Sequence, residues 1–87
     1  MQVFVSNIPY RATEDDIRKI FEDENIDVLN VRILMEGDKS KGYGFVDLPD
    51  HENVESVVEK MNQVQLMGRT IYVEKARGVQ KRQTRQN

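Results

Sequence analysis

The sequence contains no cysteine and no tryptophan, and its single histidine is His51. Without cysteine the chain can form neither a disulfide framework nor a thiolate nucleophile or metal site. A lone histidine with no histidine or cysteine partner also argues against zinc. No apolar run approaches the roughly 20 residues of a membrane-spanning helix, and the N-terminus lacks a signal-peptide pattern. We therefore expect neither a membrane protein nor a secreted one.

Basic charge is scarce over most of the chain. The 87 residues, enough for one small domain, carry a net charge of −2. Residues 1–75 hold nine Lys and Arg against fifteen Asp and Glu, whereas residues 76–87 hold four basic residues and no acidic one. The total charge argues mildly against nucleic acid as a partner, but this uneven distribution does not.

Apolar residues follow two periodicities along the chain. Alternation of apolar and polar residues predicts four strands, at residues 2–6, 28–34, 41–48 and 70–75. Helical spacing predicts a helix that begins after Thr13, a typical N-cap with Asp16 three residues later, and stops near Asn25. A second helix should begin at Pro49-Asp50, with Asp50 as its N-cap, and its apolar stripe should be Val54, Val57, Val58 and Met61.

The order strand, helix, strand, strand, helix, strand predicts an α+β fold. Two helices should cover one face of a four-stranded antiparallel sheet, the ferredoxin-like βαββαβ sandwich. The other face of the sheet should stay open. We expect this domain to span residues 1–77, and residues 78–87 to be a basic, disordered tail because they contain one apolar residue, Val79.

The octamer KGYGFVDL at residues 41–48 places aromatic side chains on that open face. Side chains alternate along a strand, so Tyr43 and Phe45 share a face with Lys41 and Asp47, which cannot be buried unpaired at low cost. The same reasoning turns Phe4 outward. Leaving an aromatic exposed forgoes about 1.5–3 kcal/mol of burial, so we expect a contiguous aromatic cluster to bind a partner. Two further apolar side chains should join this face, those of Leu34 and Tyr72.

These segments resemble the RNA recognition motif family. Residues 41–47 match the family octamer Lys/Arg-Gly-aromatic-Gly/Ala-aromatic-Val-x-aromatic, and Leu48 departs from it at the last position. Residues 3–8, VFVSNI, are similar to the family hexamer, and residues 68–73 are similar to its last strand. The resemblance covers residues 2–77. Because the first strand starts within two residues of Met1, the chain also resembles compact single-domain proteins of bacteria and organelles, with a fragment of a longer protein as the alternative.

The resemblance implies binding of about two to four nucleotides of single-stranded RNA. It implies that Phe4 and Tyr43 stack on successive bases, that Phe45 packs against sugars or a base, and that Lys41 pairs with a phosphate. Residues 75–77 would offer backbone groups to base edges, and Arg32 and Lys39 could follow the phosphate backbone. The predicted RNA-binding residues are therefore Phe4, Tyr43, Phe45, Lys41, Arg32, Lys39, Tyr72, Lys75 and Arg77. We expect a monomer in the cytoplasm, or in the nucleus of a eukaryote, with no cofactor, metal or catalytic residue.

Other interpretations stay open at this point. A subset of the family binds peptides through an acidic first helix and an Arg-x-Phe segment; the first helix here is acidic, but residues 64–66 read VQL. An enzyme of this architecture would need a glycine-bearing anion cradle after the first strand, which residues 7–11 (NIPYR) lack. Single-stranded DNA stays an alternative ligand, and the exposed aromatics could instead pack under the tail or a second chain.

Overall fold

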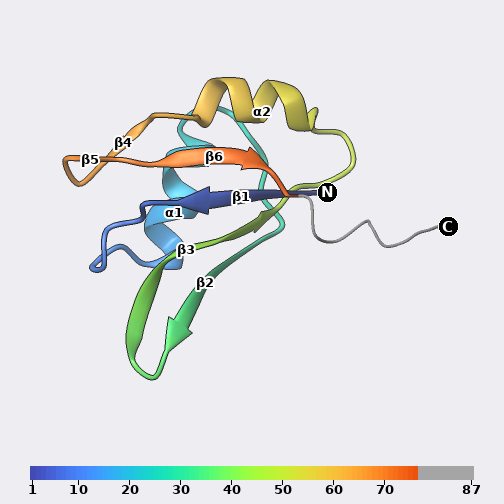
Figure 1. The fold of residues 1–87 in the computed structure, drawn as a ribbon. Helices are drawn as coiled ribbons and strands as arrows, with labels where there is room; N and C mark the ends of the chain where they lie inside the picture. Colours follow the sequence, from blue (N-terminus) through green and yellow to red (C-terminus); the bar gives the residue numbers. More distant parts are fainter. Residues whose placement is uncertain (77–87) are drawn as a thin grey trace, which may run out of the picture.

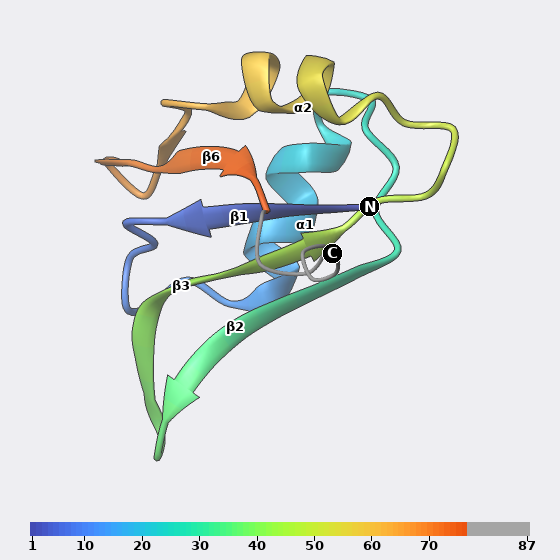
Figure 2. The same ribbon diagram turned by 45° about the vertical axis from the view of Figure 1, so that its right-hand side comes forward.

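The protein, described by a computed structural model for residues 1–76, is a four-stranded antiparallel sheet with two helices on one face (Figures 1 and 2). The sheet order is β2-β3-β1-β6, as expected for the ferredoxin-like fold. Its elements are β1 (Gln2–Ser6), α1 (Glu14–Glu22), β2 (Asn30–Glu36), β3 (Lys39–Asp47), α2 (Val54–Met61) and β6 (Tyr72–Lys75). Arg77 and the predicted tail lie outside the described residues. Within residues 1–76 no helix is long and apolar enough to cross a membrane.

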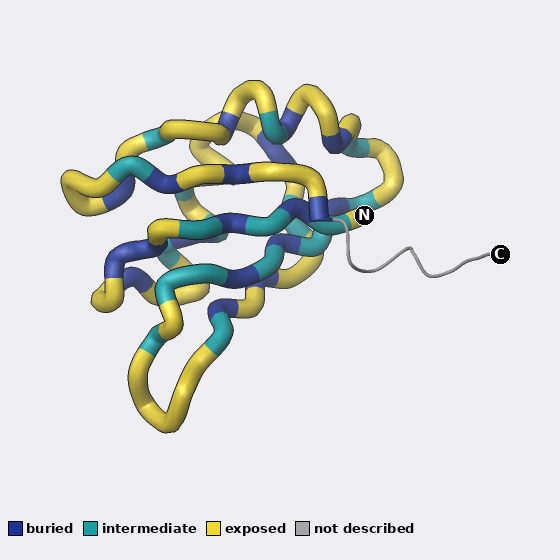
Figure 3. Tube along the Cα trace, in the orientation of Figure 1, coloured by how far each residue is buried: buried dark blue, intermediate teal, exposed yellow. Residues whose placement is uncertain are grey.

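The central strand β1 alternates between a buried and an open face, as predicted. Val3 and Val5 are almost fully buried against the helices, whereas Phe4 between them is only half-buried. Figure 3 shows the same alternation along β3. Phe4 is paired with Phe45 of β3 on one side and with Glu74 of β6 on the other. Phe4 therefore occupies the middle of the open face.

Helix α1 begins with the predicted capping box. The Asp16 N–H donates to Thr13 Oγ1 at 3.1 Å, and the Thr13 N–H donates to Asp16 Oδ2 at 2.9 Å. This reciprocal pair satisfies two N–H groups that the helix leaves unbonded. Ile17 and Phe21 are buried in the core. The helix ends at Glu22, earlier than predicted, and Asn25 adopts a left-handed φ of 63° in the following loop.

The predicted start of the second helix is wrong by one turn. Helix α2 begins at Val54, and its N-cap is Asn53, whose Oδ1 accepts a hydrogen bond from the Ser56 N–H at 2.9 Å. Asp50 and His51 lie in the preceding turn, so neither belongs to the helix. An N-cap usually stands directly before the first apolar residue of the stripe. Asn53 meets that condition and Asp50 does not.

A short hairpin that the sequence analysis did not predict precedes the last strand. Strands β4 (Gln65–Leu66) and β5 (Arg69–Thr70) pair across the turn Met67–Gly68. Both turn residues have positive φ, 53° and 79°, as a two-residue hairpin turn with the strand twist requires. The predicted strand 70–75 is therefore divided at Ile71, which is fully buried and bonded through its backbone to residues 63 and 64.

Candidate functional site

Three aromatic rings meet on the open face of the sheet. The Phe4 ring centroid lies 5.6 Å from that of Tyr43 and 5.4 Å from that of Phe45, with interplanar angles of 46° and 58°. All three residues are half-buried. We call Phe4, Tyr43 and Phe45 the aromatic cluster. The structure thus brings together three predicted site residues from two adjacent strands, β1 and β3.

Gly44, between the two aromatics of β3, lets β2 lie close to this cluster. A Cβ atom at position 44 would overlap the carbonyl oxygen of Arg32 and lie 2.9 Å from the Cα of Ile33. The close approach also places the Arg32 guanidinium carbon 5.9 Å from the centroid of the Phe45 ring, within the range of a cation–π interaction. Arg32 is therefore a positive charge at the edge of the aromatic cluster.

Two lysines of β3 lie where the β2–β3 hairpin extends beyond the sheet. Lys39 and Lys41 are exposed, and neither forms an ion pair within residues 1–76. Together with Tyr43 and Tyr10 they line a depression of about 1020 Å³, and Tyr10 is 74% exposed. Two acidic residues, Glu36 and Asp38, share this lining. Tyr10 is not among the residues predicted from the sequence, although an aromatic residue directly after Pro9 in a predicted loop is a visible signal.

The remaining predicted residues lie at the periphery. Tyr72 is opposite Ser6 in the register and 47% exposed, without a ring contact to the aromatic cluster. Lys75 directs its ammonium group to Glu55 of α2, with an Nζ–Oε2 distance of 3.5 Å. The Lys75 side chain therefore points to the helix side, and the role predicted for this residue concerns its backbone groups. Leu34 is half-buried on β2.

Two acidic residues also belong to the open face. Glu74 is paired with Phe4, and Asp47 is paired with Gln2 and with Asn30. Neither carboxylate has a hydrogen bond or an ion pair within residues 1–76. The unpaired cations therefore lie toward the β2–β3 hairpin, where Glu36 and Asp38 are also located, and the two unpaired carboxylates of the open face lie beside Phe4 and at the other end of β3.

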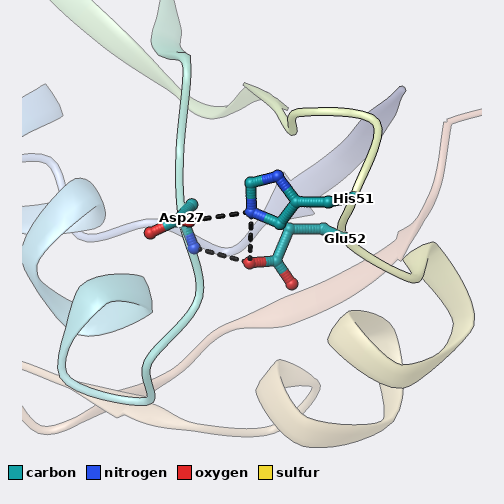
Figure 4. Close-up of side chains that lie close together, drawn as sticks. All are labelled: Asp27, His51 and Glu52. Atoms are coloured by element: carbon teal, nitrogen blue, oxygen red, sulfur yellow. Dashed lines mark hydrogen bonds and ion pairs between the residues drawn. The ribbon is translucent and has the colours of Figure 1, made fainter.

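His51 lies in a separate polar cluster with Asp27 and Glu52 (Figure 4). Its Nε2 is 2.8 Å from Asp27 Oδ2 and 3.7 Å from Glu52 Oε2, and the Asp27 N–H donates to the same Glu52 oxygen at 2.8 Å. These contacts join the α1–β2 loop to the β3–α2 loop. Two carboxylates beside the histidine are a donor set that residue spacing did not reveal. The hydrogen bond between His51 and Asp27 and the one from the Asp27 N–H to Glu52 hold these three residues together.

Comparison with known proteins identifies the fold and its two motif strands. The family model "RNA recognition motif" matches residues 3–72, which include the whole aromatic cluster. The chain belongs to the RNA recognition motif family. The motif strands are β1 and β3, which lie side by side at the centre of the sheet.

Individual RNA recognition motif proteins align with most of the chain. The human cleavage stimulation factor subunit 2 tau variant is 37% identical over 76 residues, covering 85% of this chain and 12% of that protein. The Xenopus laevis zinc finger CCHC-type and RNA-binding motif-containing protein 1 is 41% identical over 71 residues, covering 79% and 32%. The structure of the Rna15 RRM with bound RNA (GU) has a TM-score of 0.72 at 28% identity, covering 86% and 81%. The chain therefore spans only a small part of the curated relatives.

Proposed function

We propose that this chain binds single-stranded RNA, with bases stacked on the aromatic cluster. The observation that carries the proposal is that Phe4, Tyr43 and Phe45 adjoin on the sheet face that neither helix covers. Every base has a π-face, so stacking on such a surface suits RNA of many sequences, at about 1–3 kcal/mol per base. Membership of the RNA recognition motif family and an RNA-bound structural relative support the same conclusion.

The unpaired cations would hold the phosphate backbone. Lys39 and Lys41 project from the hairpin end of β3, and Arg32 lies over Phe45, where it can reach a phosphate or stack on a base. A strand of RNA that crosses the sheet would thus meet positive charge beside the aromatic cluster. Tyr72 would flank the site, and residues 75–77 would contribute backbone groups to base edges. We further propose a monomer without catalytic activity that acts in the cytoplasm, or in the nucleus of a eukaryote; single-stranded DNA stays an alternative ligand.

The proposal is tested by equilibrium binding of a fluorescein-labelled pool of random octaribonucleotides, measured by fluorescence anisotropy. Phe4→Ala and Tyr43→Ala should each weaken binding by roughly 5- to 150-fold, the range that one lost stack implies. Met67→Ala is the matched control, because Met67 is an exposed apolar residue (55%) at the β4–β5 turn, and it should bind like the unaltered protein. Equal affinity of all four proteins would refute the proposal.

The same pool in deoxyribose form tests the preference for RNA, since only a contact to the 2′-hydroxyl distinguishes the two sugars.

The rival function is that of a peptide-binding module, which would bind neither the RNA pool nor the DNA pool. Peptide-binding members of the family carry an Arg-x-Phe segment where this chain has residues 64–66. Leu66 of that segment is only 8% exposed, so it cannot serve as an exposed anchor. An unaltered protein that is folded and binds neither pool would favour the peptide-binding function.

A further inference from the structure

The side chain next to the central aromatic ring is an unpaired carboxylate. Phe4 has two directly paired neighbours on the open face, Phe45 of β3 and Glu74 of β6. The Glu74 carboxylate forms no ion pair and no hydrogen bond within the part of the chain that the structure describes. The next residue, Lys75, directs its side chain to the opposite face of the sheet, where its ammonium group lies 3.5 Å from Glu55 of α2.

The geometry brings this carboxylate to the edge of any base that stacks on Phe4. Directly paired residues of antiparallel strands have Cβ atoms about 4.5–5.5 Å apart on the same face. A base centred over the Phe4 ring therefore has Phe45 beside one edge and the Glu74 side chain beside the opposite edge. An ionised carboxylate only accepts hydrogen bonds, and it repels phosphate. The group that satisfies Glu74 in a complex is therefore a hydrogen-bond donor, and the part of the RNA that lies beside it is the edge of the base stacked on Phe4.

The four bases differ in the donors that they offer. On its Watson–Crick edge guanine carries two adjacent donors, N1–H and the 2-amino group, which match the two oxygens of one carboxylate. Adenine and cytosine each offer one amino group beside ring acceptors, and uracil offers one N–H between two carbonyl oxygens. A site whose acceptor is left unpaired by the wrong base discriminates strongly against it. We propose that Glu74 selects guanine for the position stacked on Phe4. This inference rests on the proposed RNA binding and adds a base preference to it.

The other open-face acid provides a matched control. Asp47 also lacks a partner, but it is paired with Gln2 and Asn30 rather than with Phe4. Removal of either charge reduces the repulsion of phosphate, so Glu74→Gln and Asp47→Asn should raise the affinity for octauridine to a similar extent. Only Glu74→Gln should change the preference among bases. Both residues lie on the face that the helices leave open, so both variants should keep the fold, which their melting curves would verify.

The experiment uses labelled octauridine and four versions in which one central nucleotide is guanosine, inosine, adenosine or cytidine. The unaltered protein should bind the guanosine RNA at least about 10-fold more tightly than it binds octauridine. Inosine, which keeps N1–H but lacks the 2-amino group, should show an intermediate gain. Glu74→Gln should lose most of the guanosine preference while it binds octauridine at least as well as the unaltered protein. Asp47→Asn should keep the preference.

Three results would overturn the inference. The unaltered protein could bind all five RNAs equally, Glu74→Gln could keep the full preference for guanosine, or Asp47→Asn could abolish it and so assign base recognition to the other acid. Each of these results leaves RNA binding intact. Failure of the unaltered protein to bind any of the five RNAs, in contrast, would refute the proposed function together with the inference.

Discussion

Replacing Gly44 with alanine should destabilise the fold by forcing β2 away from β3. The added methyl group would overlap the backbone carbonyl oxygen of Arg32 and lie 2.9 Å from the Cα of Ile33. Real Cβ atoms essentially never come this close to backbone, and the obstacle cannot rotate away as a side chain could. Overpacking of a core costs about 1–3 kcal/mol, and we expect Gly44→Ala at the upper end of that range. Such a loss corresponds to a fall in melting temperature of roughly 10–20 °C for a domain of this size.

Urea unfolding followed by circular dichroism measures this loss directly. Gly37→Asn is the control, because Gly37 (φ 63°) has no atom within 4 Å of its added Cβ and asparagine tolerates left-handed backbone. We expect the control to change the free energy of unfolding by less than about 0.5 kcal/mol. A Gly44→Ala protein as stable as this control would show that β2 does not lie so close to β3, and would remove the basis for placing Arg32 over Phe45.

Three further predictions address the faces of β3, the cap of α2 and the C-terminal charges. Val46→Ala should lower the free energy of unfolding by about 2 kcal/mol, because Val46 is 1% exposed, and Tyr43→Ala should lower it clearly less. Equal losses of stability in thermal melts would show that the two faces of β3 are assigned the wrong way round. Asn53→Ala should lower the free energy of unfolding by about 1 kcal/mol, and Asp50→Ala should leave it almost unchanged. The reverse order in urea unfolding would contradict the N-cap described for α2. Deletion of residues 79–87 removes three basic residues, so the slope of log affinity against log salt should fall by at most about 2; parallel salt plots would show that these charges take no part.

The parts of the fold that could be predicted from the sequence are those set by residues close together in the chain. The Thr13 capping box and the alternation around Phe4 depend on neighbouring residues only, and the structure confirms both. The start of α2 was predictable but misread, because Asp50 and Asn53 can both cap a helix and only Asn53 stands directly before the apolar stripe. The β4–β5 hairpin has strands of two residues, which are too short to show any periodicity.

The site was predictable where it follows from side-chain alternation and unpredictable where it depends on distant pairs. The cluster of Phe4 with Tyr43 and Phe45 required only that the two motif strands be neighbours. The ion pair of Lys75 with Glu55 joins residues 20 positions apart, so it was not visible in the sequence. The same holds for the position of Glu74 beside Phe4, because only the pairing register establishes it.

A titration of ¹⁵N-labelled protein with a single-stranded octaribonucleotide, followed by amide chemical shifts, tests the central claim most directly. The account predicts that the largest shifts lie in β1 and β3, at Phe4, Tyr43 and Phe45, with smaller ones at Arg32 and along the β2–β3 hairpin. Amides on the outer surfaces of α1 and α2 should stay unchanged, because both helices lie on the opposite face of the sheet. Shifts confined to the helices, or none at all at saturating RNA, would contradict the account.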